Sequence, residues 1–302
     1  MCVPIYYILL YDKLTLNKSL MFFIFVDSMK KLYILKIGGS ILTNKNSERL
    51  YLHKKRISKI AKQIKTALNK DPDLQLIIVH GAGGEVHHLA HKYSLQNGTG
   101  LNNNKLYGAT LTRLAVQKLN TQIFNIFLEN GLPVLPVHTS STVIQKNKKI
   151  STLNTKIITG TINNNCIPLL YGDMTLDTVC GMSISSGDAS TAYLAKHLDI
   201  KKIFLATDVQ GIFTKDPYKY SDATLIKKTT LSNVFFAQNI SLTKSHNTDT
   251  TDGMKGKLRS FNNLLPSKTA TQQIILFDGT KPENYTKLLT NSYIPATYID
   301  VV

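Results

Sequence analysis

The sequence lacks several features that would assign it at once to a class of protein. It has no tryptophan and only three cysteines among 302 residues, and Cys2, Cys166 and Cys180 show no CxxC spacing. This odd, widely spaced set excludes a disulfide framework and a cysteine-based zinc site, and it fits a reduced, cytoplasmic setting. No GxxxxGK[ST] segment occurs, so the chain has no Walker-type phosphate loop.

Long hydrophobic runs are also missing. Residues 1–28 contain two short apolar patches, which are interrupted by Asp12, Lys13, Asn17 and Lys18. Neither patch reaches the roughly 18 residues that a membrane-spanning helix needs, and no small-residue cleavage site follows them. We therefore expect no stable membrane insertion, and we interpret residues 1–28 as a leader that is disordered or reflects a start site placed too early. A peripheral membrane anchor is the alternative.

Acidic residues are scarce, because 19 Asp and Glu stand against 36 Lys and Arg, a formal net charge of +17. Such an excess favours anionic partners, such as nucleic acids, membrane surfaces or phosphorylated small molecules. The basic residues are scattered, with no block of five or more like charges and no basic–aromatic recognition motif. We therefore predict no nucleic-acid partner.

The rest of the chain alternates apolar strands with amphipathic helical stretches, and 43% of the residues are hydrophobic, enough for a packed core. Strands are predicted at 32–37, 74–80, 133–138, 166–172 and 272–279, and within 202–213, where the strand ends on Thr207-Asp208. A hairpin is predicted at 174–184, helices over 50–70, 105–130, 185–198 and from 252, and a last helix and strand to about 300. This alternation predicts an α/β fold with a mostly parallel, helix-covered sheet. We expect one globular domain over residues 29–302, with two lobes that meet near residue 175.

Four of the predicted strands end in small or polar residues. These turns are Gly38-Gly39-Ser40, Gly81-Ala82-Gly83-Gly84, Gly172-Asp173, and Thr207-Asp208 through Gly211. Ligands in open α/β sheets lie beyond the carboxyl ends of the strands. Glycine lets the backbone approach a phosphate, and a following helix N-terminus supplies free N–H groups. A single turn of this kind has an ordinary steric explanation, whereas two of them beside lysines suggest two phosphates that face each other.

Three lysines accompany these turns. Lys36 precedes the first glycine pair, Lys45 follows it, and Lys257 stands in DGMKGKL. Phosphoryl transfer needs positioning and positive charge on the transferred group, although each lysine in so basic a chain could also be a solvated surface residue. Asp188, at the start of a predicted helix, fits an N-cap and also a carboxylate that fixes the lysines, and the two roles are compatible.

Two adjacent histidines, His87 and His88, follow the second turn. They point in different directions at the start of a helix, so at most one of them enters a site.

Taken in order, these segments resemble the motifs of the amino-acid kinase superfamily and, within it, of the isopentenyl phosphate kinases. The resemblance is carried by KIGGSILTNK (36–45), HGAGGEVH (80–87), VQKLN (116–120), YGDMTLD (171–177), SGDAS (186–190), TDVQGIFTKDP (207–217) and NTDTTDGMKGKL (247–258). It covers roughly residues 30 to 300 with order and spacing kept. It implies a three-layer αβα sandwich, a homodimer, an acceptor-binding lobe at about 29–175 and an ATP-binding lobe at about 176–302.

The resemblance also implies roles for individual residues. Lys36, Lys45 and Lys257 would hold the ATP phosphates, Asp188 would organise these lysines, and His87 would bind the acceptor phosphate. The other ATP-side residues would be Gly38, Gly39, Ser40, Gly83, Thr207, Asp208, Gly211, Lys215 and Gly253, and the other acceptor-side residues Gly81, Ala82, Gly83, Gly172 and Asp173. Mg²⁺ would enter only as the ion that bridges ATP, since the sequence shows no cluster of metal ligands.

The implied reaction is ATP-dependent phosphorylation of isopentenyl phosphate. A monophosphate acceptor is already an anionic nucleophile, so in-line attack needs no general base. Gly84-Glu85-Val86 departs from the family's Ser-Phe-Gly, and Glu85 brings a carboxylate beside an anion site. Either Glu85 faces solvent or the acceptor differs. A fosfomycin-type phosphonate kinase and a non-catalytic ligand-binding relative therefore stay open.

Overall fold

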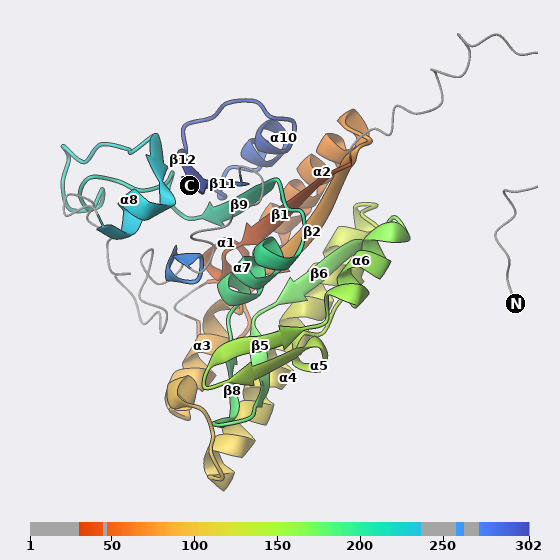
Figure 1. The fold of residues 1–302 in the computed structure, drawn as a ribbon, viewed down its shortest axis with the longest axis vertical. Helices are drawn as coiled ribbons and strands as arrows, with labels where there is room; N and C mark the ends of the chain where they lie inside the picture. The colour runs from red at the N-terminus through yellow and green to blue at the C-terminus, as the bar shows by residue number, and fades with distance from the viewer. Residues whose placement is uncertain (1–29, 45–46, 237–257, 263–271, 302) are drawn as a thin grey trace, which may run out of the picture. The chain divides into compact units, whose positions relative to one another are not determined.

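The protein is described by a computed structural model over residues 30–44, 47–236, 258–262 and 272–301. The fold described here is that of the compact unit Lys31–Val302 (Figure 1). Within the described part of the chain, no helix combines the length and the apolar character needed to cross a membrane. The division into two lobes near residue 175 stays a prediction.

An eight-stranded sheet forms the centre of this unit, in the order β10-β12-β11-β9-β1-β2-β6-β3. Its strands are β1 (Lys31–Ile37), β2 (Leu74–His80), β3 (Val134–Pro136), β6 (Ile167–Tyr171), β9 (Lys202–Thr207), β10 (Lys228–Thr230), β11 (Gln272–Asp278) and β12 (Thr297–Val301). All neighbouring strands are parallel except β11 and β12, which are antiparallel. The predicted mostly parallel sheet is therefore confirmed.

Helices cover both faces of this sheet. They are α1 (Gly39–Leu42), α2 (Lys54–Lys70), α3 (Gly83–Lys92), α4 (Asn103–Glu129), α5 (Thr139–Thr142), α6 (Thr155–Asn163), α7 (Gly187–His197), α8 (Leu231–Phe236) and α10 (Glu283–Leu289), with a 3₁₀ turn η2 (Leu95–Asn97). Successive side chains of a strand point to opposite faces. Leu35 and Ile37 accordingly join a core with α2, α4 and α10, whereas Ile34 joins a second core with α6 and α7. Two cores on opposite faces of one sheet confirm the three-layer αβα architecture.

A second, four-stranded sheet packs beside the long helix α4. It consists of β4 (Val143–Lys146), β5 (Lys149–Leu153), β7 (Asp173–Asp177) and β8 (Gly181–Ser185), in the order β5-β4-β7-β8. The predicted hairpin at 174–184 corresponds to β7 and β8. Sequence analysis did not find β4, β5 or α6, because residues 143–163 are rich in Thr, Asn and Lys and show no strong hydrophobic period.

The strand within 202–213 ends at Thr207, as expected, where the hydroxyl donates a hydrogen bond to the Val209 carbonyl at 2.8 Å and turns the chain out of the sheet. One predicted boundary is wrong. The helix expected from residue 50 begins at Lys54, because Leu52 pairs with Thr43 in an isolated β-bridge. The helix predicted from 252 falls largely outside the described residues.

Candidate active site

The carboxyl ends of β1, β2 and β9 meet at one edge of the large sheet through backbone contacts. The N–H of Gly38 donates to the Ala206 carbonyl of β9 at 3.0 Å. A Cβ atom added to Gly81 would lie 2.5 Å from the backbone nitrogen of Gly39, and one added to Gly39 would lie 2.9 Å from that of Gly83. The first and second glycine turns therefore touch each other, at a separation that only glycine permits.

The turn after β6 joins the same edge. The N–H of Gly172 donates to the His80 carbonyl at 3.4 Å. A Cβ on Gly172 would lie 3.2 Å from the nitrogen of Gly187, and a Cβ on Gly187 would lie 3.2 Å from the His80 oxygen. The start of α7 therefore packs directly on the ends of β2 and β6. We refer to this meeting of Gly38–Ser40, Gly81–Gly83, Gly172 and Gly187 as the glycine junction.

Several backbone N–H groups of the glycine junction have no hydrogen-bond acceptor among the residues that the structure describes. They belong to Gly39, Ser40, Ala82, Gly83, Gly187 and Asp188. These groups stand at the starts of α1, α3 and α7, where the first N–H groups of a helix have no partner within it. Unpaired N–H groups and the positive ends of helix dipoles favour bound anions such as phosphates.

A buried ion pair lies at the junction. The ammonium group of Lys36, on β1, is 2.8 Å from the Asp188 carboxylate, and the two side chains are 6% and 11% exposed. The N-cap of α7 is Ser186, whose side chain accepts from the Ala189 N–H at 3.1 Å, so the interpretation of Asp188 as an N-cap is wrong. Asp188 instead fixes the position of one of the predicted phosphate-binding lysines.

Thr43 connects the first two turns, a role that sequence analysis missed. Its hydroxyl donates to the Gly39 carbonyl at 3.1 Å and accepts from the Gly84 N–H at 3.2 Å. Gly83 adopts a φ of +80°, and a Cβ there would lie 2.9 Å from the Thr43 side chain. The only signal in the sequence was that Thr43 belongs to the segment KIGGSILTNK.

The two histidines of α3 diverge as their spacing predicts. His87 is half-buried, whereas His88 is exposed and lies 3.9 Å from Glu48. The role of His87 toward an acceptor phosphate stays a prediction.

A pocket opens beside Gly83 and Gly84. Its lining residues are Thr43, Asn44, Arg49, Leu50, Tyr51, Ala82, Gly83, Gly84, Glu85, Val86, Ala115 and Leu119. Val86, Ala115 and Leu119 give it an apolar wall, and Glu85 shares it with Arg49. Glu85 is half-buried, and the alternative that it faces solvent stays a prediction.

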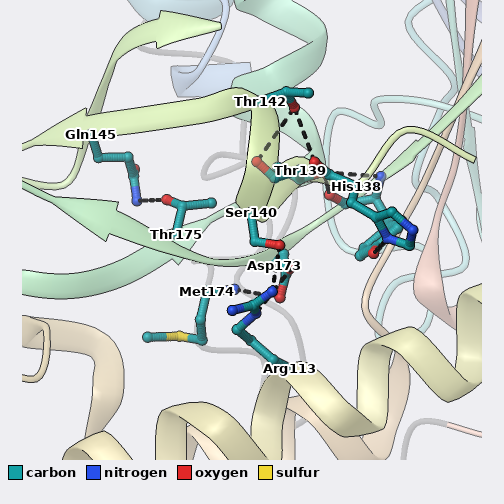
Figure 2. Close-up of polar contacts among 10 residues, drawn as sticks. Arg113, His138, Thr139, Ser140, Thr142, Gln145, Asp173, Met174 and Thr175 are labelled. Carbon is teal, nitrogen blue, oxygen red and sulfur yellow. Dashed lines mark hydrogen bonds and ion pairs between the residues drawn. The ribbon is translucent and has the colours of Figure 1, made fainter.

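Asp173 has a fully buried carboxylate that faces α4 and α5 (Figure 2). One oxygen accepts from the Met174 N–H at 2.8 Å, and the other lies 3.9 Å from Nε of Arg113. Arg113 also donates to the Ser140 hydroxyl at 2.7 Å. Burial raises the pKa of Asp173, while Ser140 and Arg113 act in the opposite direction. Oδ2 of Asp173 has no hydrogen-bond partner among the described residues, and the role of Asp173 toward an acceptor stays a prediction.

The other residues predicted for the ATP side form a less uniform group. Thr207 is buried beside the junction and Asp208 is exposed. Gly211 packs against Thr297, and Lys215 pairs with Asp222 at 2.5 Å, with both side chains largely exposed.

Three predicted residues, Lys45, Gly253 and Lys257, lie outside the described residues. Within the described ranges, no three His, Cys, Asp or Glu side chains gather to hold a metal ion.

Known proteins similar to this chain share its motifs and its fold. Residues 31–276 match the amino acid kinase family. The isopentenyl phosphate kinases of Methanothermobacter thermautotrophicus and Methanocaldococcus jannaschii are each 31% identical to it, over 88% and 89% of this chain and 98% of each relative. A solved isopentenyl phosphate kinase structure is 27% identical with a TM-score of 0.73, and the match covers 89% of this chain and all of that one.

Proposed function

We propose that this chain, which belongs to the amino acid kinase family and within it to the isopentenyl phosphate kinases, transfers the γ-phosphate of ATP to isopentenyl phosphate. The product would be isopentenyl diphosphate, a building block of isoprenoid biosynthesis by an alternative mevalonate route. The enzyme is a phosphotransferase with a phosphate group as acceptor.

In this reaction an oxygen of the acceptor phosphate attacks the γ-phosphorus, a new P–O bond forms, and the bond to the β-phosphate oxygen breaks so that ADP leaves. Catalysis of such a step consists mainly of positioning and charge stabilisation. The N–H groups of Gly39 and Ser40 would hold the donor phosphates, and those of Ala82 and Gly83 the acceptor. Lys36, fixed by Asp188 at 2.8 Å, would neutralise charge between them.

The observation that carries the proposal is the direct contact between the first and second glycine turns. A Cβ on Gly81 would lie 2.5 Å from the Gly39 nitrogen, so anions bound on the two turns would be neighbours. The unpaired N–H groups on both sides of this contact support the same arrangement. A protein that merely bound one small anion would not need two such turns in contact.

Mg²⁺ would be supplied with ATP and would bridge its phosphates. The described residues of the junction provide N–H donors and an ammonium group and no set of carboxylates for a metal. This donor set suits a metal that is held by the nucleotide rather than by the protein. Lys45 and Lys257, outside the described residues, and His87 are proposed to complete the charge stabilisation.

The apolar side chains of Val86, Ala115 and Leu119, close to Gly83, favour an acceptor with a short hydrocarbon chain over the small polar skeleton of fosfomycin. No observation favours the phosphonate kinase or the non-catalytic alternative over this one.

A coupled assay of ADP release tests the proposal, with isopentenyl phosphate, dimethylallyl phosphate, fosfomycin and UMP compared side by side. We expect the highest kcat/KM with isopentenyl phosphate. Preferred turnover of fosfomycin would move the assignment to the phosphonate kinases, and turnover of none of the four would leave a ligand-binding relative.

We also propose that the enzyme is a homodimer that acts in the cytoplasm, where ATP is abundant. The outer face of the small sheet supports a partner surface, because Ile144 and Leu176 form a cross-strand pair and are 43% and 57% exposed. Sedimentation analysis of the wild type and of Leu176→Lys tests this: a dimer that dissociates in the variant is expected, and a monomeric wild type would contradict it.

A further inference from the structure

His80 is a fully buried histidine at the end of β2, immediately before the glycine turn. Its Nδ1 lies 2.9 Å from the Gly81 carbonyl oxygen, and its Nε2 lies 3.1 Å from the side-chain oxygen Oδ1 of Asn120 on α4. The ring also stacks on Tyr171 of β6, with 5.3 Å between the ring centroids. Contacts from two other elements and from its own turn therefore fix this one imidazole.

The contacts determine which nitrogen carries the hydrogen. A neutral imidazole has one N–H, so one nitrogen needs an acceptor and the other needs a donor. Both nitrogens face an oxygen atom, and a neutral ring can donate to only one of them. The Gly81 carbonyl is part of the backbone and can only accept, whereas a half-turn of the Asn120 amide brings its NH₂ group to Nε2. We therefore assign the hydrogen to Nδ1. Burial lowers the pKa of His80, while the hydrogen bonds to Gly81 and Asn120 oppose this shift, and the lowered value favours the neutral form.

The hydrogen bond from Nδ1 also sets the direction of the next N–H group. In a planar trans peptide, the C=O and the N–H point in opposite directions. Because the Gly81 oxygen is held toward the imidazole, the Ala82 N–H is turned away from it. The nitrogens of Ala82 and Gly83 lie 3.8 and 2.9 Å from the place that a Cβ on Gly39 would occupy. These N–H groups therefore border the contact between the two glycine turns, and neither has an acceptor among the described residues.

We propose that His80 is a positioning residue that, as the Nδ1–H tautomer fixed by Asn120, orients the Gly81–Ala82 peptide so that the Ala82 and Gly83 N–H groups meet the acceptor phosphate. The identity of the acceptor rests on the proposed function, but the orientation of the peptide does not. If His80 only filled space, its ring and the stacking on Tyr171 would be sufficient, and the hydrogen bond to Gly81 would have no effect on the acceptor.

Two substitutions separate the hydrogen bond from the ring. In His80→Asn the amide takes the place of Nδ1 and can still donate to Gly81, whereas in His80→Gln it reaches the place of Nε2 and cannot. Both variants lose the stacked ring, so their losses in Tm should be similar. We expect the KM for isopentenyl phosphate to stay within about threefold in His80→Asn and to rise about tenfold or more in His80→Gln, with the KM for ATP unchanged in both.

Asn120→Ala provides a variant that keeps the imidazole itself. Without Asn120, the His80 ring can also adopt the Nε2–H tautomer. In that tautomer Nδ1 no longer donates to the Gly81 carbonyl, so the peptide is less firmly oriented. We expect the acceptor KM to rise about fivefold, and an unchanged KM would argue against the tautomer as the controlling feature.

An NMR titration with inorganic phosphate tests the orientation without turnover. The Ala82 amide resonance should move on titration in the wild type and in His80→Asn but not in His80→Gln, and the imidazole nitrogens of His80 should report a neutral ring protonated at Nδ1. If this pattern holds while no acceptor is turned over, the proposed function fails and the positioning role stands. Equal acceptor KM values and equal shifts in the two His80 variants would overturn the positioning role, as would an imidazolium or an Nε2–H ring.

Discussion

Two sets of turns in this molecule use their backbone N–H groups in opposite ways. In the small sheet, the Asp177 carboxylate accepts from the N–H groups of Asn147, Lys148, Val179 and Cys180 at 2.7 to 3.0 Å. At the glycine junction, the N–H groups of Gly39, Ser40, Ala82 and Gly83 have no acceptor in the described part of the chain.

The two regions differ in whether the protein itself supplies the acceptor. In the small sheet, the Asp177 carboxylate, which also accepts from the Ser183 hydroxyl at 2.8 Å, satisfies these N–H groups without a ligand. The glycine junction supplies donors and the buried Lys36, and in the described part of the chain no side chain satisfies these donors. Gly39, Ser40 and Ala82 are partly exposed, and the proposed anion would supply the missing acceptor. The predictions below test this contrast.

The largest effect is expected for Lys36→Met. Removing the ammonium group should lower kcat by about 10³, as for the loss of a charge-stabilising group, and should also leave the Asp188 carboxylate buried and unpaired, at a cost of about 3–5 kcal/mol in unfolding free energy. Steady-state kinetics and urea unfolding measure the two effects.

The double variant Lys36→Met/Asp188→Asn separates these two effects. Neutralising the carboxylate should restore much of the lost stability without restoring activity. A single variant that kept more than about a tenth of the wild-type kcat/KM would remove Lys36 from the catalytic machinery.

Gly81→Ala should separate the two glycine turns, because the new Cβ would lie 2.5 Å from the Gly39 nitrogen. A displacement of this kind costs about 100-fold in kcat/KM. Gly160→Ala is the matched control, since a Cβ at this position in α6 meets no atom within 4 Å. The control should keep full activity and gain up to about 1 kcal/mol of stability. Similar kinetics in the two variants would mean that contact between the turns is not needed.

Asp177→Asn should affect stability and leave the chemistry intact. It removes the charge that five donors share, so the unfolding free energy should fall by about 2–3 kcal/mol, with kcat within about twofold of the wild type when measured below Tm. A large loss of kcat in the folded variant would contradict the contrast between the two regions.

The same carboxylate predicts a pH dependence of stability. Burial acts to raise the pKa of Asp177, but hydrogen bonds from Cys180, Lys148, Val179 and Ser183 outweigh it and hold the pKa well below its ordinary value. Its contribution is therefore fully present above the unfolded pKa of about 3.9 and is lost as the pH falls below it. Wild-type stability should drop more steeply than that of Asp177→Asn between pH 5 and pH 2.

The smallest effect is expected for Glu85→Gln. Glu85 lines the pocket at the start of α3 and brings a negative charge toward a bound anion. Its neutralisation should lower the KM for isopentenyl phosphate about threefold, and the gain should shrink at high salt. Glu48→Gln is the control, because Glu48 is exposed and is not among the pocket residues. A higher KM in Glu85→Gln would mean that the carboxylate helps to hold the acceptor.

Sequence reasoning predicted the glycine turns because parallel strands end at the same edge of a sheet, so turns at 38–40, 81–84 and 172–173 had to be neighbours. Lys36 and Asp188 were also singled out, and the structure pairs them, although the N-cap interpretation of Asp188 was wrong. It missed the side chains that support the turns, because their partners are distant in sequence: His80 meets Asn120, and Asp173 meets Arg113.

The short strands β4 and β5 were missed for a different reason. The two strands pair through backbone hydrogen bonds, and the Asp177 carboxylate, about 30 residues away in the sequence, accepts from the turn between them. Neither kind of interaction produces a hydrophobic pattern in the sequence. Interactions of this kind are set by tertiary structure rather than by local propensity.

The most direct test follows backbone amide resonances of the ¹⁵N-labelled protein during titration with isopentenyl phosphate. The account predicts that the Ala82 and Gly83 resonances move strongly downfield as their N–H groups gain an anionic acceptor, while those of Asn147 and Lys148, already bound to Asp177, stay in place. Saturable binding that leaves the Ala82 and Gly83 resonances unmoved would contradict it.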